Sequence, residues 1–198
     1  WSPLAGRNRT RPPGRASPRR RIRGLIFADV AGFSRLSDTQ VLAFHETVMT
    51  RIARTIESFA SHVLTAQTWG DGLYVVLDDV AAAANCALAL QETVASVDLQ
   101  AAGAGLGALR GIRIAASAAP VFDGWDPVSG VRIFFGKGVT QTARIEPRTP
   151  EGEVYVTHQF ASLTALGTEG AFETQYVGTI PTAKDYGPLP LFALRRRT

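Results

Sequence analysis

The chain has 198 residues, of which 45% are hydrophobic and 19% are charged. This length and apolar content suit one domain with a real core and exclude a chain that stays unfolded throughout. A single cysteine, Cys86, excludes an intrachain disulfide and a zinc site built from cysteines, and it favours a reducing, cytoplasmic setting.

The longest apolar stretch, Val80 to Leu90, is short and contains Asn85, so we expect no membrane-spanning segment. No signal peptide is recognisable. The first residue is Trp1 rather than Met, which suggests a trimmed fragment.

The formal net charge of +4 belongs to one end of the chain. Residues 1–24 hold eight arginines and no acid, and the remainder carries 13 basic and 17 acidic residues. Because the first segment is rich in Pro, Gly, Ser and Arg, we predict a flexible basic lead-in over residues 1–21 and one folded domain over 22–198. Such a segment can contact the phosphates of nucleic acid or a membrane. No aromatic residues interleave with its arginines, so we expect neither partner.

The first half of the domain predicts two helices and a hairpin. Residues 24–30 form a short apolar run that reads as a buried strand ending near Asp29. Apolar residues then recur at helical spacing from Val41 to Phe59, with Asp38 at the start. An extended region over 63–77 is broken by Trp-Gly-Asp-Gly at 69–72, a hairpin signal. An alanine-rich helix follows over 80–97.

The second half predicts further strands and shorter helices. The small residues at 101–107 read as a loop rather than a dinucleotide fingerprint, because no strand precedes them. Strands are expected at 111–122, 131–135 and 153–157, extended segments near 172–178 and 189–195, helices at 138–145 and 158–166, and a turn cluster at 123–130. The order predicts an α+β domain with helices on one face of a largely antiparallel sheet.

Two aspartates stand at positions that suit cation binding. Asp29 ends a buried strand and Asp71 lies in a tight turn. Either one alone reads as a helix cap or an ordinary turn residue. Neighbouring strands can instead bring both carboxylates into one site for two divalent cations, Mg²⁺ or Mn²⁺, with the backbone carbonyl of Val30 as a further ligand.

The segment after Asp29 adds a second indication. Gly32, Phe33 and Ser34 lead into a helix, where free backbone N–H groups can cradle a phosphate and glycine allows close approach. Read alone, Gly32 is a turn glycine. Metal carboxylates beside an amide cradle predict a nucleoside triphosphate site.

Three motifs together resemble the class III nucleotidyl cyclase catalytic domain. They are Phe-Ala-Asp-Val-Ala-Gly-Phe-Ser (27–34), Trp-Gly-Asp-Gly (69–72) and Phe-Gly-Lys-Gly-Val-Thr-Gln-Thr-Ala-Arg-Ile-Glu (135–146), the last followed by Gly-Glu-Val-Tyr-Val-Thr (152–157). The resemblance covers roughly residues 22–195. It implies a ferredoxin-like α+β domain that dimerises head to tail, with active sites at the dimer interface.

The resemblance also implies roles for single residues. Asp29 and Asp71 match the metal ligands, Arg144 matches the arginine that stabilises charge on the α-phosphate, and Lys184 matches, at looser spacing, the triphosphate lysine.

Three positions depart from the family pattern. Gln67 stands where the family has its adenine-selecting lysine, Ile133 where it has the companion aspartate, and Thr140 where it has the ribose-orienting asparagine. Gln67 and Ile133 cannot read adenine as a lysine–aspartate pair does, nor guanine as a glutamate–cysteine pair does. The Gln67 amide has a donor and an acceptor, which suits a pyrimidine edge.

A narrower resemblance points to the pyrimidine cyclases of bacterial Pycsar antiphage systems. It rests on residues 119–128, 142–147 and 183–192. It implies a homodimeric cyclase with two Mn²⁺ or Mg²⁺ ions per site that converts UTP or CTP into a cyclic nucleotide for a partner effector, with UTP favoured. The alternatives are a cytidylate cyclase, an adenylate or guanylate cyclase with unusual base contacts, and an inactive domain that only dimerises or binds nucleotide.

Overall fold

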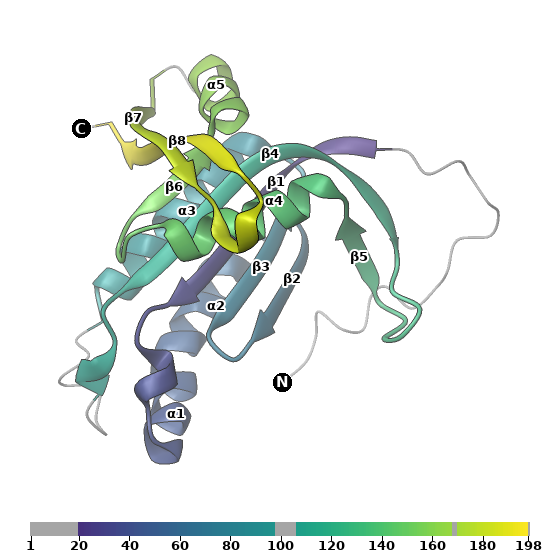
Figure 1. Ribbon diagram of the computed structural model, residues 1–198. Coiled ribbons are helices and arrows are strands. Elements are labelled where there is room, and N and C mark those ends of the chain that lie inside the picture. Colours follow the sequence, from purple (N-terminus) through teal and green to yellow (C-terminus); the bar gives the residue numbers. More distant parts are fainter. Residues whose placement is uncertain (1–19, 98–105, 168–169, 198) are drawn as a thin grey trace.

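Strands and helices alternate along the part of the chain that the computed structural model describes, residues 20–97, 106–167 and 170–197 (Figure 1). The strands are β1 Arg20–Val30, β2 Val63–Trp69, β3 Gly72–Leu77, β4 Ile112–Trp125, β5 Arg132–Phe135, β6 Val154–Thr157, β7 Phe172–Pro181 and β8 Pro188–Arg196. The helices are α1 Asp38–Phe44, α2 Thr50–Glu57, α3 Val80–Ala95, α4 Lys137–Ile145 and α5 His158–Gly167. A π-helical segment, His45–Met49, joins α1 to α2.

The eight strands of the described residues form one sheet in the order β2-β3-β1-β4-β6-β8-β7, with β5 paired to β4. β4 and β6 run parallel, and the other neighbouring pairs are antiparallel. β1 pairs with β4 from Arg20 opposite Phe122 to Val30 opposite Ile112. β3 flanks β1 on its other side. The end of β1, which carries Asp29, is therefore held inside the sheet.

Alternate strand residues face two different hydrophobic layers. On one face, Ile26, Val75 and Ala116 are buried in a core that also contains residues of α2, α3 and α5. On the other face, Leu25 and Tyr74 pack with a residue of α4. Figure 1 shows α4 in front of the strands and α2 and α3 behind them. The expectation of an α+β domain with a mainly antiparallel sheet is confirmed, but the expectation that all helices cover one face is wrong for α4.

Close backbone packing explains how so short a helix binds the second face. A Cβ at Gly138 would lie 2.3 Å from the Cβ of Ala119 on β4, so only glycine allows this approach. Behind it, Thr142 and Ile145 are fully buried. One glycine and two larger side chains therefore hold α4 against β4. This pattern does not by itself show which face of the sheet the helix covers.

The predicted elements are confirmed with shifted boundaries. β1 begins at Arg20 rather than Gly24 and so includes two residues that the sequence placed in the basic lead-in, whose other residues, 1–19, lie outside the described chain. The predicted helix from Val41 to Phe59 is divided by the π-helical segment. β4 continues through part of the predicted turn cluster at 123–130. The predicted loop at 101–107 falls mostly outside the described residues.

In the described part of the chain, no helix combines the length and the apolar character needed to cross a membrane. Cys86 is buried in α3 as a free thiol.

Candidate active site

The two predicted metal carboxylates lie together at one edge of the sheet. Asp29 is the last residue but one of β1, and Asp71 lies in the turn between β2 and β3, the strand that pairs with β1. The pKa of Asp71 is raised to about 7, mainly by burial and then by a hydrogen bond with the Asp29 carboxyl and by its negative charge. Two carboxylates this close repel each other, so the pair favours either a proton or a cation between them.

A hollow of about 320 Å³ opens beside these carboxylates. All six residues that the sequence assigned to metal binding and the phosphate cradle line it, together with one alanine and three arginines: Asp29, Val30, Ala31, Gly32, Phe33, Ser34, Arg35, Asp71, Arg110 and Arg113. The hollow therefore places two carboxylates, a turn of backbone and several cationic side chains around one space.

The turn after β1 is tight because of Gly32. Its φ of 96° lies in the left-handed region, and a Cβ there would lie 2.2 Å from the carbonyl oxygen of Ala108. A 3₁₀ turn follows at Phe33–Arg35, in which Arg35 and Leu36 donate their N–H groups to Gly32 and Phe33. Phe33 and Ser34 are the first two residues of this turn, so their N–H groups have no partner within it and can be offered to an anion.

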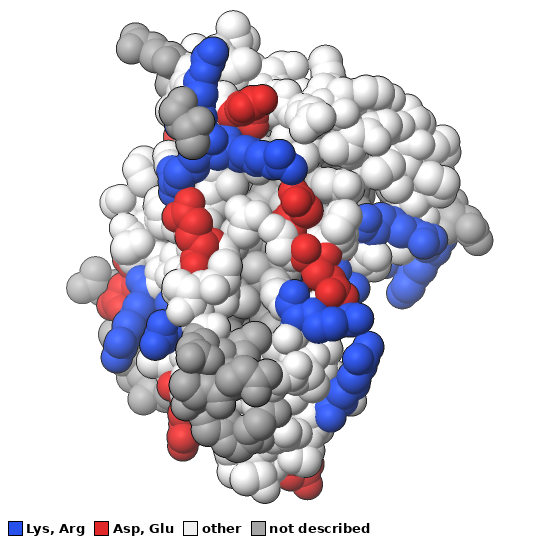
Figure 2. All heavy atoms as spheres, turned by 90° about the vertical axis from the view of Figure 1, so that its left-hand side faces the viewer, with Lys and Arg blue, Asp and Glu red and all other residues white. Residues whose placement is uncertain are grey.

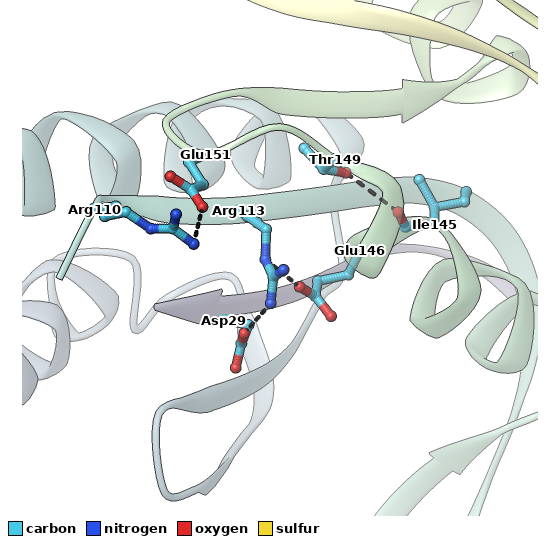
Figure 3. Close-up of polar contacts among 7 residues, drawn as sticks. All are labelled: Asp29, Arg110, Arg113, Ile145, Glu146, Thr149 and Glu151. Atoms are coloured by element: carbon cyan, nitrogen blue, oxygen red, sulfur yellow. Dashed lines mark hydrogen bonds and ion pairs between the residues drawn. The ribbon is translucent and has the colours of Figure 1, made fainter. Parts of the chain in front are cut away.

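Arg113 points toward Asp29, one of the two predicted metal carboxylates, and forms an ion pair with it (Figure 3). It lies opposite Asp29 in the β1–β4 register, and its guanidinium donates a hydrogen bond to the Asp29 carboxylate. Its Nε lies 3.1 Å from Oε1 of Glu146, the residue after α4, as an ion pair without hydrogen-bond alignment. Burial raises the pKa of Glu146 to about 7; Arg113 opposes this rise, and Asp29 and Asp71 add to it.

Sequence reasoning missed Arg110, Arg113 and Glu146. Arg110 lines the same hollow and forms an ion pair of 2.6 Å with Glu151. Asp29 and Arg113 are 84 positions apart, and only the strand register brings them together. The one signal in the sequence is that Glu146 ends the motif that contains Arg144.

The two residues at the predicted base-reading positions, Gln67 and Ile133, lie away from the hollow. Gln67 on β2 stands opposite Tyr74 on β3, and the Tyr74 hydroxyl donates to the carbonyl oxygen of Phe134 at 3.1 Å. Ile133, the neighbour of Phe134 on β5, is half-buried, as is Gln67. Tyr74 thus ties the strand that carries Ile133 to the strand beside Gln67, and neither predicted residue lines the hollow.

Thr140 and Arg144 follow the outer side of α4, one helical turn apart. Between them, the buried Thr142 hydroxyl donates to the Gly138 carbonyl at 2.7 Å and lies 2.5 Å from the hydroxyl of Ser117 on β4. This contact fixes the rotation of α4 and leaves Thr140 exposed. Neither Thr140 nor Arg144 lines the hollow.

Lys184 lies in the 3₁₀ turn between β7 and β8, exposed and in the left-handed region with a φ of 54°. A non-glycine residue in this region is uncommon and is typical of tight turns and functional sites. It does not line the hollow either. The site residues predicted from the sequence therefore fall into two groups: six around the hollow, and Gln67, Ile133, Thr140, Arg144 and Lys184 away from it.

No known family model and no curated protein matches the chain, whereas solved structures do. The adenylyl cyclase CyaB from P. aeruginosa matches with a TM-score of 0.79 and 16% identity over 92% of this chain and 98% of that one. The guanylyl cyclase Cya2 matches with a TM-score of 0.74 and 20% identity over 92% and 96%. The guanylate cyclase domain of RhGC from Catenaria anguillulae, solved with GTP, matches with a TM-score of 0.73 and 19% identity over 92% and 100%.

The chain has the class III nucleotidyl cyclase fold.

Class III cyclases typically use two metal ions. The hollow offers a small number of protein ligands that suit such ions. Among the described residues, no group of three or more His, Cys, Asp or Glu side chains is arranged to hold a metal ion. Asp29 and Asp71 supply two carboxylates, and Val30 lines the hollow beside them. Mg²⁺ and Mn²⁺ suit such a site, because they are commonly held by one or two carboxylates, with substrate phosphates and water completing the shell.

Proposed function

We propose that the chain is a metal-dependent nucleotidyl cyclase that converts UTP into 3′,5′-cyclic UMP and pyrophosphate. The observation that carries the proposal is the hollow, which brings Asp29, Asp71 and the backbone turn at Gly32–Ser34 together within the cyclase fold. A cation pair and a triphosphate need this combination of oxygen ligands and free N–H groups.

Asp29, Asp71 and the Val30 carbonyl would hold two Mn²⁺ or Mg²⁺ ions. These ions, when bound, make the ribose 3′-hydroxyl a better nucleophile and neutralise charge on the triphosphate. The N–H groups of Phe33 and Ser34 bind phosphate oxygens. The 3′-hydroxyl loses its proton to water, and its oxygen forms a bond to the α-phosphorus as the bond from that phosphorus to the pyrophosphate oxygen breaks.

The second group of residues serves the other parts of the nucleotide. Arg144 stabilises the charge that develops on the α-phosphate, Thr140 orients the ribose through its hydroxyl, and Lys184 contacts the triphosphate. None of these lines the hollow of their own chain. Two copies arranged head to tail would bring this group to the hollow of the partner, so we propose a homodimer with both sites at its interface.

The proposed base preference follows from Gln67 and Ile133. An adenine amino group facing Ile133 finds no acceptor, and an unpaired buried polar group costs roughly 1–3 kcal/mol. The Gln67 amide can pair with a carbonyl and an N–H of uracil together, and with its amide flipped it can serve cytosine. These residues therefore favour pyrimidines. The preference for UTP over CTP, and a role as an antiphage second-messenger enzyme that signals to an effector, rest on the Pycsar resemblance.

One observation favours an inactive, nucleotide-binding domain instead. Thr140 replaces the asparagine of the family pattern, and its side chain is shorter. Against this, Asp29, Asp71 and Arg144 all keep the family's residue types, and an inactive domain would have no reason to keep all three.

The test is incubation of the protein with each of the four ribonucleoside triphosphates and Mn²⁺, with products identified by mass. We expect cyclic UMP as the main product and cyclic CMP second. Faster formation of cyclic AMP or cyclic GMP would replace the pyrimidine assignment with a purine cyclase. No cyclic product from any triphosphate would favour the inactive domain.

A further inference from the structure

The Arg113 side chain bridges two carboxylates that come from different parts of the fold (Figure 3). On one side it donates to Asp29 at the end of β1, and on the other its Nε lies 3.1 Å from Glu146 after α4. The side chains of Arg113, Asp29 and Glu146 are only 28%, 27% and 15% exposed. This is a partly buried bridge rather than a pair on the open surface.

Around this bridge, carboxylates outnumber the guanidinium that interacts with them. Asp29, Asp71 and Glu146 face one another closely enough for their charges to interact, and Arg113 is the cation that interacts with Asp71 and Glu146 and pairs with Asp29. Arg110, another arginine that lines the hollow, forms an ion pair with Glu151 instead. Arg113 thus provides the positive charge at the place where a divalent cation would bind Asp29.

Glu146 has a separate part in this arrangement. Its Oε1 is buried and lacks an aligned hydrogen bond, so the charge of Arg113 is what compensates its burial. Moving Arg113 far away would leave Glu146 buried without a counter-ion. The guanidinium can therefore release Asp29 at a lower cost than it can release Glu146.

We propose that Arg113 is a positioning residue that neutralises Asp29 until a divalent cation displaces it, while Glu146 keeps the displaced guanidinium in the hollow. This rests on the proposed function in one respect, because it takes Asp29 as a cation ligand. It goes beyond that function because it assigns Arg113 as a competitor of the cation for Asp29, and Glu146 as the residue that holds Arg113 in the hollow.

The test measures how tightly the nucleotide-free protein binds Mn²⁺, by titration calorimetry or by the electron paramagnetic resonance signal of free Mn²⁺. Arg113→Gln removes the competitor and should tighten Mn²⁺ binding by about fivefold, the factor that corresponds to the upper end of the range for ion pairs that are not fully buried. Arg110→Gln is the matched control, since it removes the same charge from the same hollow but leaves Asp29 with Arg113. It should change the affinity by no more than about twofold.

Glu146→Gln should weaken Mn²⁺ binding, because Arg113 then keeps Asp29 as its one charged partner. Arg113→Lys keeps the charge but cannot span two carboxylates as a planar guanidinium does, so it should tighten binding less than Arg113→Gln. The lysine variant decides the question if the glutamine variant fails to fold, which thermal unfolding would show.

Unchanged or weaker binding by Arg113→Gln, or equal tightening by Arg110→Gln, would overturn the proposal while leaving the metal site in place. With a misfolded glutamine variant, wild-type affinity in Arg113→Lys would overturn it in the same way. Absence of Mn²⁺ binding by the wild-type protein would overturn both this proposal and the metal assignment of Asp29.

Discussion

Asp71 should make the cation-free protein lose stability as the pH rises. The pKa of its carboxyl is raised from 3.8 to about 7, mainly by burial and in part by the neighbouring Asp29 carboxyl. The folded protein therefore keeps a proton that the unfolded chain releases near its ordinary pKa. Because the folded state binds more protons in this range, the free energy of unfolding is greatest below the unfolded pKa and falls as the pH rises through about 7.

The size of the loss follows from the size of the shift. A rise of about three units corresponds to ~4 kcal/mol if the whole shift is effective. Asp71 is only partly buried, and solvent screening reduces the contribution to about 1–2 kcal/mol. Glu146, whose pKa burial also raises to about 7, changes the stability in the same direction.

Urea unfolding at about pH 5.5 and about pH 8, with a chelator present, measures this loss. Asp71→Asn imitates the protonated carboxyl. The variant should therefore lose about 0.5–1 kcal/mol less than the wild type between the two pH values, because about half of the Asp71 contribution is lost in this window. Asp38→Asn, a change at an exposed residue of α1, should lose as much as the wild type. A pH-dependent loss in Asp71→Asn equal to that of the wild type would refute the reasoning.

Three further substitutions test the site. Asp29→Ala and Asp71→Ala should each abolish cyclic nucleotide formation while circular dichroism stays that of the wild type, because a lost carboxylate leaves the triphosphate charge uncompensated; wild-type turnover in either would contradict the metal assignment. Gln67→Lys combined with Ile133→Asp should raise ATP turnover relative to UTP, and an unchanged ratio would show that these side chains do not face the base. Tyr74→Phe should reduce the unfolding free energy by about 1–3 kcal/mol, since it leaves the buried Phe134 carbonyl without its donor; an unchanged denaturant midpoint would contradict that hydrogen bond.

The sequence locates the hollow well because its residues are close to the ends of predicted elements. Asp29 lies near the end of one strand, Gly32 and Ser34 follow that strand, and Asp71 lies in a turn that its flanking glycines predict. Such local features depend on a few neighbouring residues, so a single sequence shows them. The two segments meet because β1 pairs with β3, the second strand after it in the chain.

Contacts that depend on strand register or on the packing of one element against another could not be predicted from the sequence. Arg113 meets Asp29 because β4 pairs with β1 over eleven positions, and a slip of one residue would have turned it to the other face. Glu146 meets Arg113 because α4 packs on the second face of the sheet, and the short pattern of Gly138, Thr142 and Ile145 suits either face. The proposed head-to-tail pairing of two copies is likewise a matter of surfaces rather than of local pattern.

The central claim is that the hollow of one copy and the α4 residues of another complete a single active site. Asp71→Ala and Arg144→Ala should each be inactive alone, since each dimer then lacks either the metal carboxylate or the arginine at both sites. Mixed after proven subunit exchange, they should regain cyclic UMP formation, because one of the two sites in a mixed dimer carries both residues. Recovery of up to about a quarter of the wild-type rate is expected, because half of randomly exchanged dimers are mixed and each has one intact site. No recovery despite exchange would contradict the shared site and place the whole reaction within one chain.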